Sequence, residues 1–474
     1  MNPKSNDVKN ILEKYQINKI WNFSPKYYNA YINKICGDYL YENSEAFKNS
    51  KYSWVENFFW HTVIILLGAF ISIIKSCKYF KTPVVFNKEA QIIACPFCGR
   101  YVWFKYLPRI INSPVRIVYH PLFHFDYYKT SAEAYDPQMT SPEFYKFRLC
   151  DILKAFFVLL KSYNRLWHCS KELDATFGIY TGKFSRILVF PILYGGFIKS
   201  FVKRNIFDEK RKIWIFDYDY DYKYIVFNNV IHQLRKNDIT VHLQHGSFVT
   251  FNPAYCNPVS DYSLCCSKRE KKIILEYNTF DSKIRVLGAP LQTFDDIIKN
   301  KEKTEKTWDI LCLLTVGDDL NYRTMKVVLQ QLDTVKYKIR VRYRPASKES
   351  DKKLLESYVK GMEESVGKSL LEDVLMSKLV ICFSEDALYT AIRANNPTIY
   401  IRNENIDNYD MSAVPTFFYI VNASDFQSID LDRLLLCYDE CNYEHDAFII
   451  NNFGFVKLDD VSRQLNLFIT EILS

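Results

Sequence analysis

The sequence predicts an α/β protein with two parallel-sheet domains in tandem, preceded by an aromatic-rich helical N-terminal region. Short apolar stretches alternate with helical patterns twice along the 474 residues, first over 81–287 and again over 308–401. Such alternation is typical of parallel strands joined by crossover helices. The stretch 299–307 between the two series is wholly polar and predicts a linker.

The expected regions follow from these patterns. Residues 1–80 are rich in aromatic residues and lack a sheet pattern, so we expect a helical region with possible membrane contact. Residues 81–298 are expected to form the first domain and residues 308–450 the second, with a cleft between them. An amphipathic pattern over 459–473 predicts that 455–474 forms a final helix that packs back across both domains.

The first series contains short apolar strands and longer helical patterns. Helical spacing is clearest at Ile152, Phe156 and Leu160. The expected strands are 81–86, 91–94, 113–120, 212–216, 239–243, 262–265 and 283–287. The expected helices are 140–165, 170–205, 224–235 and 268–278.

The second series repeats the pattern after the polar linker. The expected strands are 308–314, 337–343, 379–383 and 398–401. The expected helices are 322–332, 354–364, 387–394 and 459–473. We find no internal repeat of a period that would indicate a solenoid.

Composition and charge exclude several classes of protein. The chain has 62 Lys and Arg against 54 Asp and Glu, a net charge of +8, which does not require a nucleic-acid partner and suits anionic lipids or phosphate-bearing substrates. With only 13 glycines there is no G-x-G-x-x-G motif. The stretch 178–184 is one residue too short for a Walker loop and lacks its Ser or Thr. P-loop and NAD-type dinucleotide folds are therefore not expected.

The cysteines indicate a reducing compartment. There are 13 of them without a framework, and the N-terminus has no signal-peptide pattern, so we expect free thiols and a cytoplasmic protein. Cys95 and Cys98 form a single C-x-x-C pair, but a zinc ribbon needs a second pair to complete its four ligands. We expect no metal site.

A run of 17 uncharged residues, 58–74, raises the question of a membrane. A spanning helix needs about 20 apolar residues. Three interpretations remain: a buried core helix, a helix that lies in the membrane interface with lysines behind it, and a true span. We expect residues 50–81 to tether a peripheral protein to the inner face of the cytoplasmic membrane without crossing it.

Polar residues follow the strands of both series. In parallel α/β sheets, ligands bind at the carboxyl ends of strands and near helix N-termini. The candidates in the first domain are Asp217, Gln244, His245, Gly246, Ser247 and Gly288. The candidates in the second domain are Thr315, Arg342, Arg344, Lys348, Ser384, Glu385 and Asp386.

Each candidate has a chemical use and a purely structural alternative. His245 is suited to proton transfer near neutral pH, and Gly246 lets the backbone approach a ligand closely. Arg340, Arg342 and Arg344 alternate along one strand, so we expect their common face to meet solvent or anions, because burying three arginines is costly. Structurally, the histidine can be a turn residue, the arginines a solvated edge, and Ser384 a helix cap.

The order of these elements resembles that of bacterial glycosyltransferases of the GT-B fold that build capsule, O-antigen and lipopolysaccharide. Residues 239–246, Ile-Thr-Val-His-Leu-Gln-His-Gly, are similar to the QHG segment that closes a strand of their acceptor domain. Residues 286–290, Val-Leu-Gly-Ala-Pro, and 371–381 also fit the family pattern, as does the donor turn 384–397. The resemblance covers about 205–405.

The resemblance implies two Rossmann-like domains and a metal-independent transfer of a sugar. The donor would be a nucleotide sugar, with a cytidine nucleotide slightly favoured, and the acceptor a glycan or a lipid-linked glycan at the inner membrane surface. No cofactor and no nucleic acid are implied. Arg342, Arg344, Lys348 and the Ser384 turn would neutralise the leaving phosphate. Asp217 or His245 would act as the general base, and inverting and retaining transfer are both compatible with these residues.

Two departures from the family pattern bear on the donor. Arg344 stands where related enzymes often have His, and Thr390 stands where many have a Glu that holds a ribose. Two alternatives therefore stay open: a polyol-phosphate transferase of the CDP-glycerol, teichoic-acid kind, and a non-catalytic membrane-associated assembly protein with a GT-B body.

Overall fold

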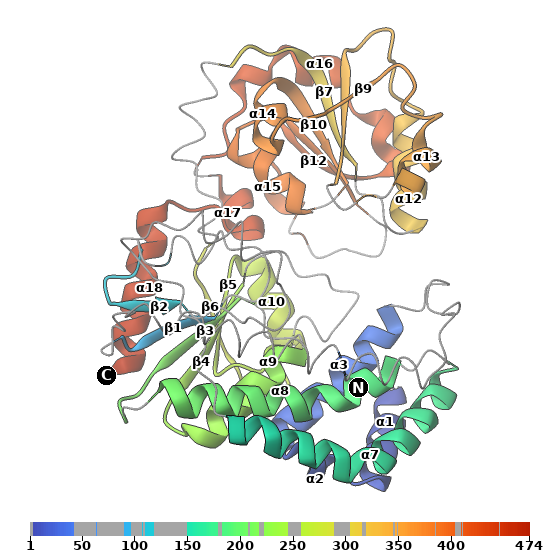
Figure 1. Cartoon of the computed structure of the whole chain (residues 1–474). Helices are drawn as coiled ribbons and strands as arrows, with labels where there is room; N and C mark the ends of the chain where they lie inside the picture. The colour runs from blue at the N-terminus through green and yellow to red at the C-terminus, as the bar shows by residue number, and fades with distance from the viewer. Residues whose placement is uncertain are drawn as a thin grey trace. The chain divides into compact units, whose positions relative to one another are not determined.

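The chain contains two separate six-stranded sheets (Figure 1). In this computed structural model every strand pairing with an assigned register is parallel. The predicted fold class, two Rossmann-like α/β sheets in tandem with a helical N-terminal part, is confirmed. The structure describes residues 3–41, 63, 90–95, 107, 110–117, 149–178, 183–206, 209–217, 222–244, 257–288, 304–314, 319–344, 347, 349–383, 385–402, 409, 411–444 and 446–474.

The first sheet has the strand order β2-β1-β3-β4-β5-β6. Its strands are β1 (Ile92–Cys95), β2 (Val115–Ile117), β3 (Ile213–Phe216), β4 (Ile239–Leu243), β5 (Tyr262–Cys265) and β6 (Lys283–Val286). The central strands β1, β3 and β4 are buried along their whole length, which explains why they are continuous apolar runs. All six coincide with predicted strands to within a few residues.

Four long helices accompany the first sheet: α7 (Leu149–Phe177), α8 (Lys183–Asn205), α9 (Tyr222–Leu234) and α10 (Lys268–Tyr277). Helix α8 packs against both α7 and α9. Gly196 of α8 lies so close to α7 that an added Cβ would collide with Ala155. A small residue at this crossing therefore sets how closely the two helices approach.

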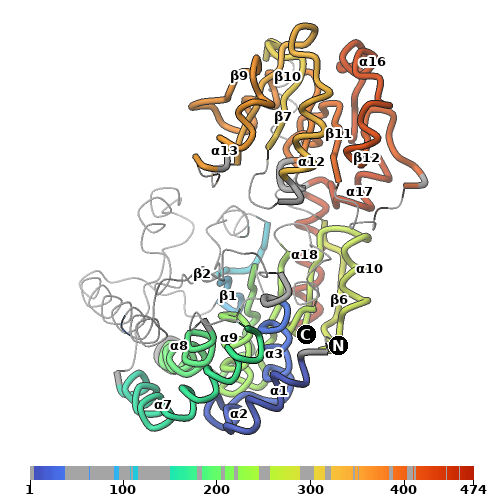
Figure 2. Tube along the Cα trace, turned by 90° about the vertical axis from the view of Figure 1, so that its right-hand side faces the viewer, coloured from blue at the N-terminus to red at the C-terminus, as the bar shows by residue number. Residues whose placement is uncertain are grey.

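Three N-terminal helices, α1 (Pro3–Lys14), α2 (Ile17–Trp21) and α3 (Pro25–Tyr41), pack beside α7, α8 and α9 (Figures 1 and 2). Aromatic side chains attach them to α8. Pro191 has no N–H, so the carbonyl of Ile187 loses its helical donor. The Tyr31 hydroxyl donates to that carbonyl at 2.8 Å, and Trp21 Nε1 donates to the next carbonyl, of Leu188, at 2.9 Å.

The second sheet has the order β12-β11-β10-β7-β8-β9. Its strands are β7 (Trp308–Leu314), β8 (Ile339–Tyr343), β9 (Glu363–Glu364), β10 (Ser377–Cys382), β11 (Thr398–Arg402) and β12 (Phe418–Asn422). Alternate residues of β7 enter different cores, with Leu311 and Leu313 on one face and Ile310 and Cys312 on the other. Both faces are therefore covered, as expected of a doubly wound sheet.

Short helices connect most strands of the second sheet: α12 (Asp319–Leu329), α13 (Glu349–Leu355), α14 (Leu370–Leu375) and α15 (Glu385–Arg393). Two more, α16 (Leu431–Leu436) and α17 (Ala447–Phe453), follow its last strand. The final helix α18 (Leu458–Leu473) matches its predicted range. Helix α14 begins with a capping box, in which Ser369 and Glu372 each bond the other's backbone N–H.

Two predicted helix boundaries are wrong. The helices expected at 140–165 and 170–205 divide at Gly178, which ends α7 in a left-handed conformation (φ 68°) that favours glycine. The helix expected at 354–364 is replaced by α13, a turn at Gly361 (φ 87°) and strand β9. Strand β12 was not predicted at all.

The chain divides into two compact units. The first unit comprises Met1–Leu264, Ile274–Arg285 and Leu465–Ser474, and the second comprises Cys265–Ile273 and Val286–Gln464. In the first unit, Asn466 of α18 donates to the carbonyl of Ile110 at 2.7 Å. The predicted domain limits, the hinge position of 299–307 and the packing of α18 across both domains stay predictions.

Among the described residues, one helix is long and apolar enough to cross a membrane, α8 over Phe184–Lys203, and most of it is buried inside the protein. A core helix passes the same test of length and composition. The predicted tether at 50–81, with its apolar run 58–74, lies outside the described residues apart from Val63.

Candidate functional site

Asp217 is the first candidate that the structure describes. It follows β3 directly and is completely buried. The hydroxyl of Tyr224, in the first turn of α9, donates a hydrogen bond to its Oδ1. Because β3 ends and α9 begins within a few residues, the carboxylate lies between a strand end and a helix N-terminus, the usual place for polar chemistry in such sheets.

Gln244 lies at the end of the neighbouring strand, β4. Its backbone N–H donates to the Leu264 carbonyl at 3.0 Å, and its side chain is buried. The register pairs Phe216 with His242, so Asp217 and Gln244 emerge at the same edge of the sheet. His245, Gly246 and Ser247, which follow at once in the sequence, lie outside the described residues.

Gly288 follows β6 and has a structural reason to be glycine. Its φ of 93° is in the left-handed region, and an added Cβ would collide with Val456 of the same unit. The family resemblance gave this residue a donor-binding role. The packing against Val456 explains the glycine by itself, and the donor-binding role stays a prediction.

Arg340 and Arg342 of β8 hold a buried carboxylate between them. Asp373 of α14 is completely buried, with its Oδ1 3.1 Å from Arg340 Nη1 and its Oδ2 2.6 Å from Arg342 Nη1. Arg340 is itself buried and also bonds Glu363 at 2.6 Å. The expectation that this row of arginines meets solvent or anions is therefore wrong for Arg340, because Asp373 supplies an internal counterion.

Arg342 is partly committed to the same network. Its Nη1 also donates to the Lys368 carbonyl at 2.8 Å and to the Ser365 hydroxyl at 3.3 Å. These contacts fix the direction of the guanidinium and leave its other nitrogens to face elsewhere. A role in donor binding for Arg342 stays a prediction, now with a defined anchor.

Arg344 differs from both, because it is exposed. It is the first residue after β8, and its N–H donates to the carbonyl of Leu314, the last residue of β7, at 3.1 Å. Burial raises the pKa of the adjacent Tyr343 to about 12, and the charge of Glu364 adds to this effect. The Tyr343 phenol therefore stays protonated at neutral pH.

The carboxyl ends of β10, β7 and β8 adjoin in the strand order. Helix α15 begins at Glu385, directly after the end of β10, so its first turn, with Glu385 and Asp386, lies at the same edge as Arg344. Thr315, Lys348 and Ser384 lie outside the described residues. An exposed guanidinium and a helix N-terminus at the same sheet edge are features suited to an anion.

The sequence did not indicate Asp373 or Tyr224 as partners of the candidate residues. The alternating arginines of the strand were expected to meet solvent or anions, and nothing in the sequence marked Asp373 as their counterion. Among the described residues no group of three His, Cys, Asp or Glu side chains could hold a metal ion. Cys95 is buried in β1, and its predicted companion Cys98 lies outside the described residues.

Solved structures similar to this chain include glycosyltransferases and epimerases. A glycosyltransferase from Rickettsia africae is 14% identical, with a TM-score of 0.48 over 81% of this chain and 98% of that one. The UDP-GlcNAc 2-epimerase from Methanocaldococcus jannaschii is 13% identical, with a TM-score of 0.46 over 80% of this chain and 99% of the epimerase.

The wall teichoic acid polymerase TagF is 12% identical, with a TM-score of 0.39 over 88% of this chain and 98% of the polymerase. At these identities the likeness concerns the fold alone. No protein-family model and no curated protein matches the sequence.

Proposed function

We propose that the chain is a glycosyltransferase of the GT-B type, which moves a sugar from a nucleotide-sugar donor to a glycan or lipid-linked acceptor in bacterial surface polysaccharide synthesis. One observation carries the proposal. Each of the two parallel sheets has a polar group of its own at the carboxyl edge, acidic at Asp217 and cationic at Arg344. Transfer from a nucleotide sugar needs both a proton acceptor and a charge for the leaving phosphate.

In this reaction the acceptor hydroxyl attacks the anomeric carbon, and the bond from that carbon to the phosphate oxygen breaks. The nucleotide leaves with the electron pair and the negative charge, while the hydroxyl proton passes to a base. Arg344 and the N-terminus of α15 would stabilise the leaving phosphate without a metal. Asp217 or His245 would accept the proton, and Tyr224 would hold the Asp217 carboxylate in position.

Further parts of the proposal concern binding and location. Gln244, Gly246, Ser247 and Gly288 would contribute to the donor site from the first domain. Thr315, Arg342, Lys348, Ser384, Glu385 and Asp386 would contribute to it from the second. The enzyme would work at the inner face of the cytoplasmic membrane, where its acceptor is made, with residues 50–81 as the attachment.

Nucleotide binding and turnover test the proposal separately. Thermal shifts with UDP, GDP, CMP and CDP rank the donor base, and we expect at least one to stabilise the protein. Arg344→Ala should weaken that nucleotide by about 10- to 100-fold, the worth of a charge-assisted hydrogen bond. Arg433→Ala removes an exposed arginine in α16, away from the strand ends, and should leave binding unchanged.

Asp217→Asn and His245→Ala distinguish the two candidate bases. The variant that removes the true base should release nucleotide from the preferred sugar donor roughly two to four orders of magnitude more slowly. It should still bind the nucleotide. Asn keeps an oxygen that can accept from Tyr224, so the Asp217 variant should fold. A protein that none of the four nucleotides stabilises, or whose two variants both retain full turnover, would contradict the proposal.

A further inference from the structure

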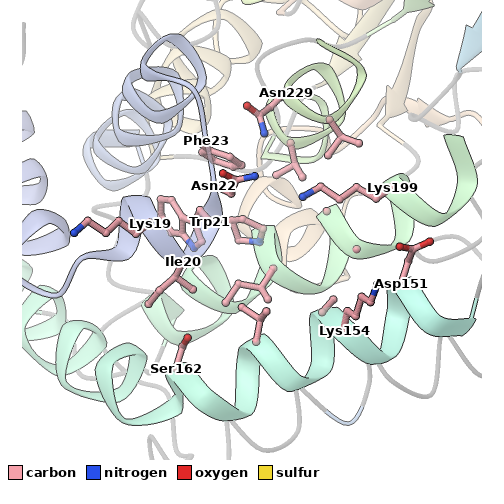
Figure 3. Close-up of a pocket in the computed structure, with 18 of the residues that line it drawn as sticks. Lys19, Ile20, Trp21, Asn22, Phe23, Asp151, Lys154, Ser162, Lys199 and Asn229 are labelled. Atoms are coloured by element: carbon pink, nitrogen blue, oxygen red, sulfur yellow. The ribbon is translucent and has the colours of Figure 1, made fainter. Parts of the chain in front are cut away.

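A pocket of about 560 Å³ opens in the first unit among α2, α7, α8 and α9 (Figure 3). Its size is in the range of small-molecule sites. None of the strand-end candidates of the first sheet contributes to its lining. The pocket is therefore separate from the candidate transfer site.

Two consecutive glycines in α8 help to make the hollow. Gly195 faces α9, where an added Cβ would stand 3.6 Å from Val226, and Gly196 faces α7 at Ala155. Both line the pocket, next to Pro191. Glycine is less favourable than alanine in a helix interior, so other contacts of α8 must offset a pair of them.

The lining is strongly basic. Five cationic side chains contribute to it, against the single carboxylate of Asp151, so the formal charge of the lining is 5 − 1 = +4; the five are Lys19, Lys154, Arg165, Lys199 and Lys203. Asp151 Oδ1 lies 3.4 Å from Lys203 Nζ. Within the described part of the chain, Lys154 and Lys199 have no acidic side chain within ion-pair distance. Grouped cations without counterions are unfavourable, and an anion in the pocket would relieve that cost.

Lys199 is the most constrained of these cations. It is half-buried in α8, and burial lowers the pKa of its ammonium, with the charge of Lys203 adding to the effect and Asp151 opposing it. Figure 3 shows its side chain on the side of the pocket where Asn229 lies. The Asn229 oxygen accepts from the Ser24 N–H at 3.1 Å, so its amide N–H groups remain as donors for an anion.

The uncharged part of the lining is mixed: it includes polar side chains such as Asn22 and Ser162 and the apolar side chains of Ile20, Val158 and Ile192. One of these, Val158 of α7, is 41% exposed, so the apolar part of the lining reaches the surface. Of the acidic side chains of this helix, Asp151 lines the pocket beside Lys203, and Glu172 is paired with Lys14 at 2.7 Å. A cationic pocket with apolar side chains in its lining matches a ligand with a charged head and an apolar chain.

We propose that this pocket binds the phosphate head of an anionic amphiphile, with the phosphate between Lys154, Lys199 and Asn229 and the apolar chain against Ile20, Val158 and Ile192. The site is independent of the proposed transfer reaction, because it shares no residue with the strand ends. Lipid head groups and free inorganic phosphate both present a phosphate to the pocket. Only the lipid also carries an apolar chain.

Calorimetry with a soluble short-chain phosphatidic acid and with inorganic phosphate tests the pocket and separates the two sources. We expect the short-chain lipid to bind at least ten-fold more tightly than phosphate. Lys199→Gln should weaken lipid binding at least ten-fold, and Lys199→Arg should restore most of it. Lys171→Gln removes the same charge from the far end of α7, outside the pocket, and should change binding by less than two-fold.

The melting temperature supplies a control for folding. Because burial of the Lys199 charge is unfavourable in the empty pocket, Lys199→Gln should melt at the same temperature as the parent or higher, whereas a lysine with a structural role would lower it. If phosphate and the short-chain lipid bind equally tightly, the proposal that the ligand is an amphiphile is wrong. If neither ligand binds, or if Lys171→Gln and Lys199→Gln weaken binding equally, the pocket is not the binding site.

Discussion

Asp217 and Asp373, one in each unit, are both completely buried carboxylates, but they have different partners. Asp217, at the end of β3, accepts a hydrogen bond from the neutral phenol of Tyr224. Asp373, in α14, lies between the guanidinium groups of Arg340 and Arg342. The two carboxylates are equally buried, so burial alone does not distinguish a structural counterion from a proton acceptor. A carboxylate fixed between two cations serves as a counterion, whereas one oriented by a hydroxyl at a strand end is suited to accept a proton.

The largest expected effect follows from removing Asp373. Asp373→Ala leaves two guanidinium groups near the core without their common counterion, which should cost about 3–5 kcal/mol of unfolding free energy. Asp217→Asn, which keeps an acceptor for Tyr224, should cost no more than about 1–2 kcal/mol. Denaturant unfolding, followed by tryptophan fluorescence, measures both. The comparison fails if the two variants unfold at the same denaturant concentration.

Acid should destabilise both units, because each contains a carboxyl group whose pKa is lowered in the folded state. Asp261 of the first unit bonds His232 Nε2 at 3.0 Å and the Thr240 N–H at 2.8 Å. Burial raises its pKa, but these bonds and the charge of His232 outweigh burial, so the pKa is lowered overall. In Asp309 of the second unit burial is outweighed by the Lys338 N–H and by Lys378, and the pKa is again lowered.

A carboxyl with a depressed pKa in the folded state stabilises the protein above its unfolded pKa, about 3.9, and that stabilisation is lost as the pH falls below this value through the folded pKa. We therefore expect unfolding below about pH 4 to be less steep in Asp261→Asn and in Asp309→Asn. Circular dichroism over a pH series measures it. Unchanged pH profiles in both variants would show that these two carboxyls do not govern acid stability.

The smallest effects are expected at exposed ion pairs. Arg285 and Glu471 pair in the first unit, and Lys336 and Asp432 pair at 2.5 Å in the second. Exposed pairs gain little because water and salt screen them. Glu471→Gln and Asp432→Asn should each shift the melting temperature less than any variant above, and the shift should vanish in high salt. A shift that persists in high salt would give these pairs a structural weight that their exposure does not predict.

Most strands and their polar ends could be predicted from the sequence, because buried parallel strands are continuous apolar runs. The strand end at Asp217 and the exposed Arg344 after β8 are examples. Strand β12 was missed since Phe418–Asn422 lacks a following helix of the expected pattern. The helix expected at 354–364 failed because pairing of Glu363 and Glu364 with β8 outweighs their local helix propensity.

Contacts between distant segments could not be predicted. Arg340 and Asp373 are 33 residues apart, and no local pattern joins them. The basic pocket combines side chains from α2, α7, α8 and α9, which only the packing of the helices brings together.

The proline in α8 has a consequence for the order in which the protein is made. Tyr31 reaches the Ile187 carbonyl across 156 residues of sequence. During synthesis the N-terminal helices leave the ribosome before α8 has been made. Their aromatic residues therefore cannot contact α8 until the chain has lengthened. Domains generally fold as units during synthesis. This contact sets the earliest moment at which the N-terminal helices can dock on α8, and until then their aromatic surface stays uncovered on that side.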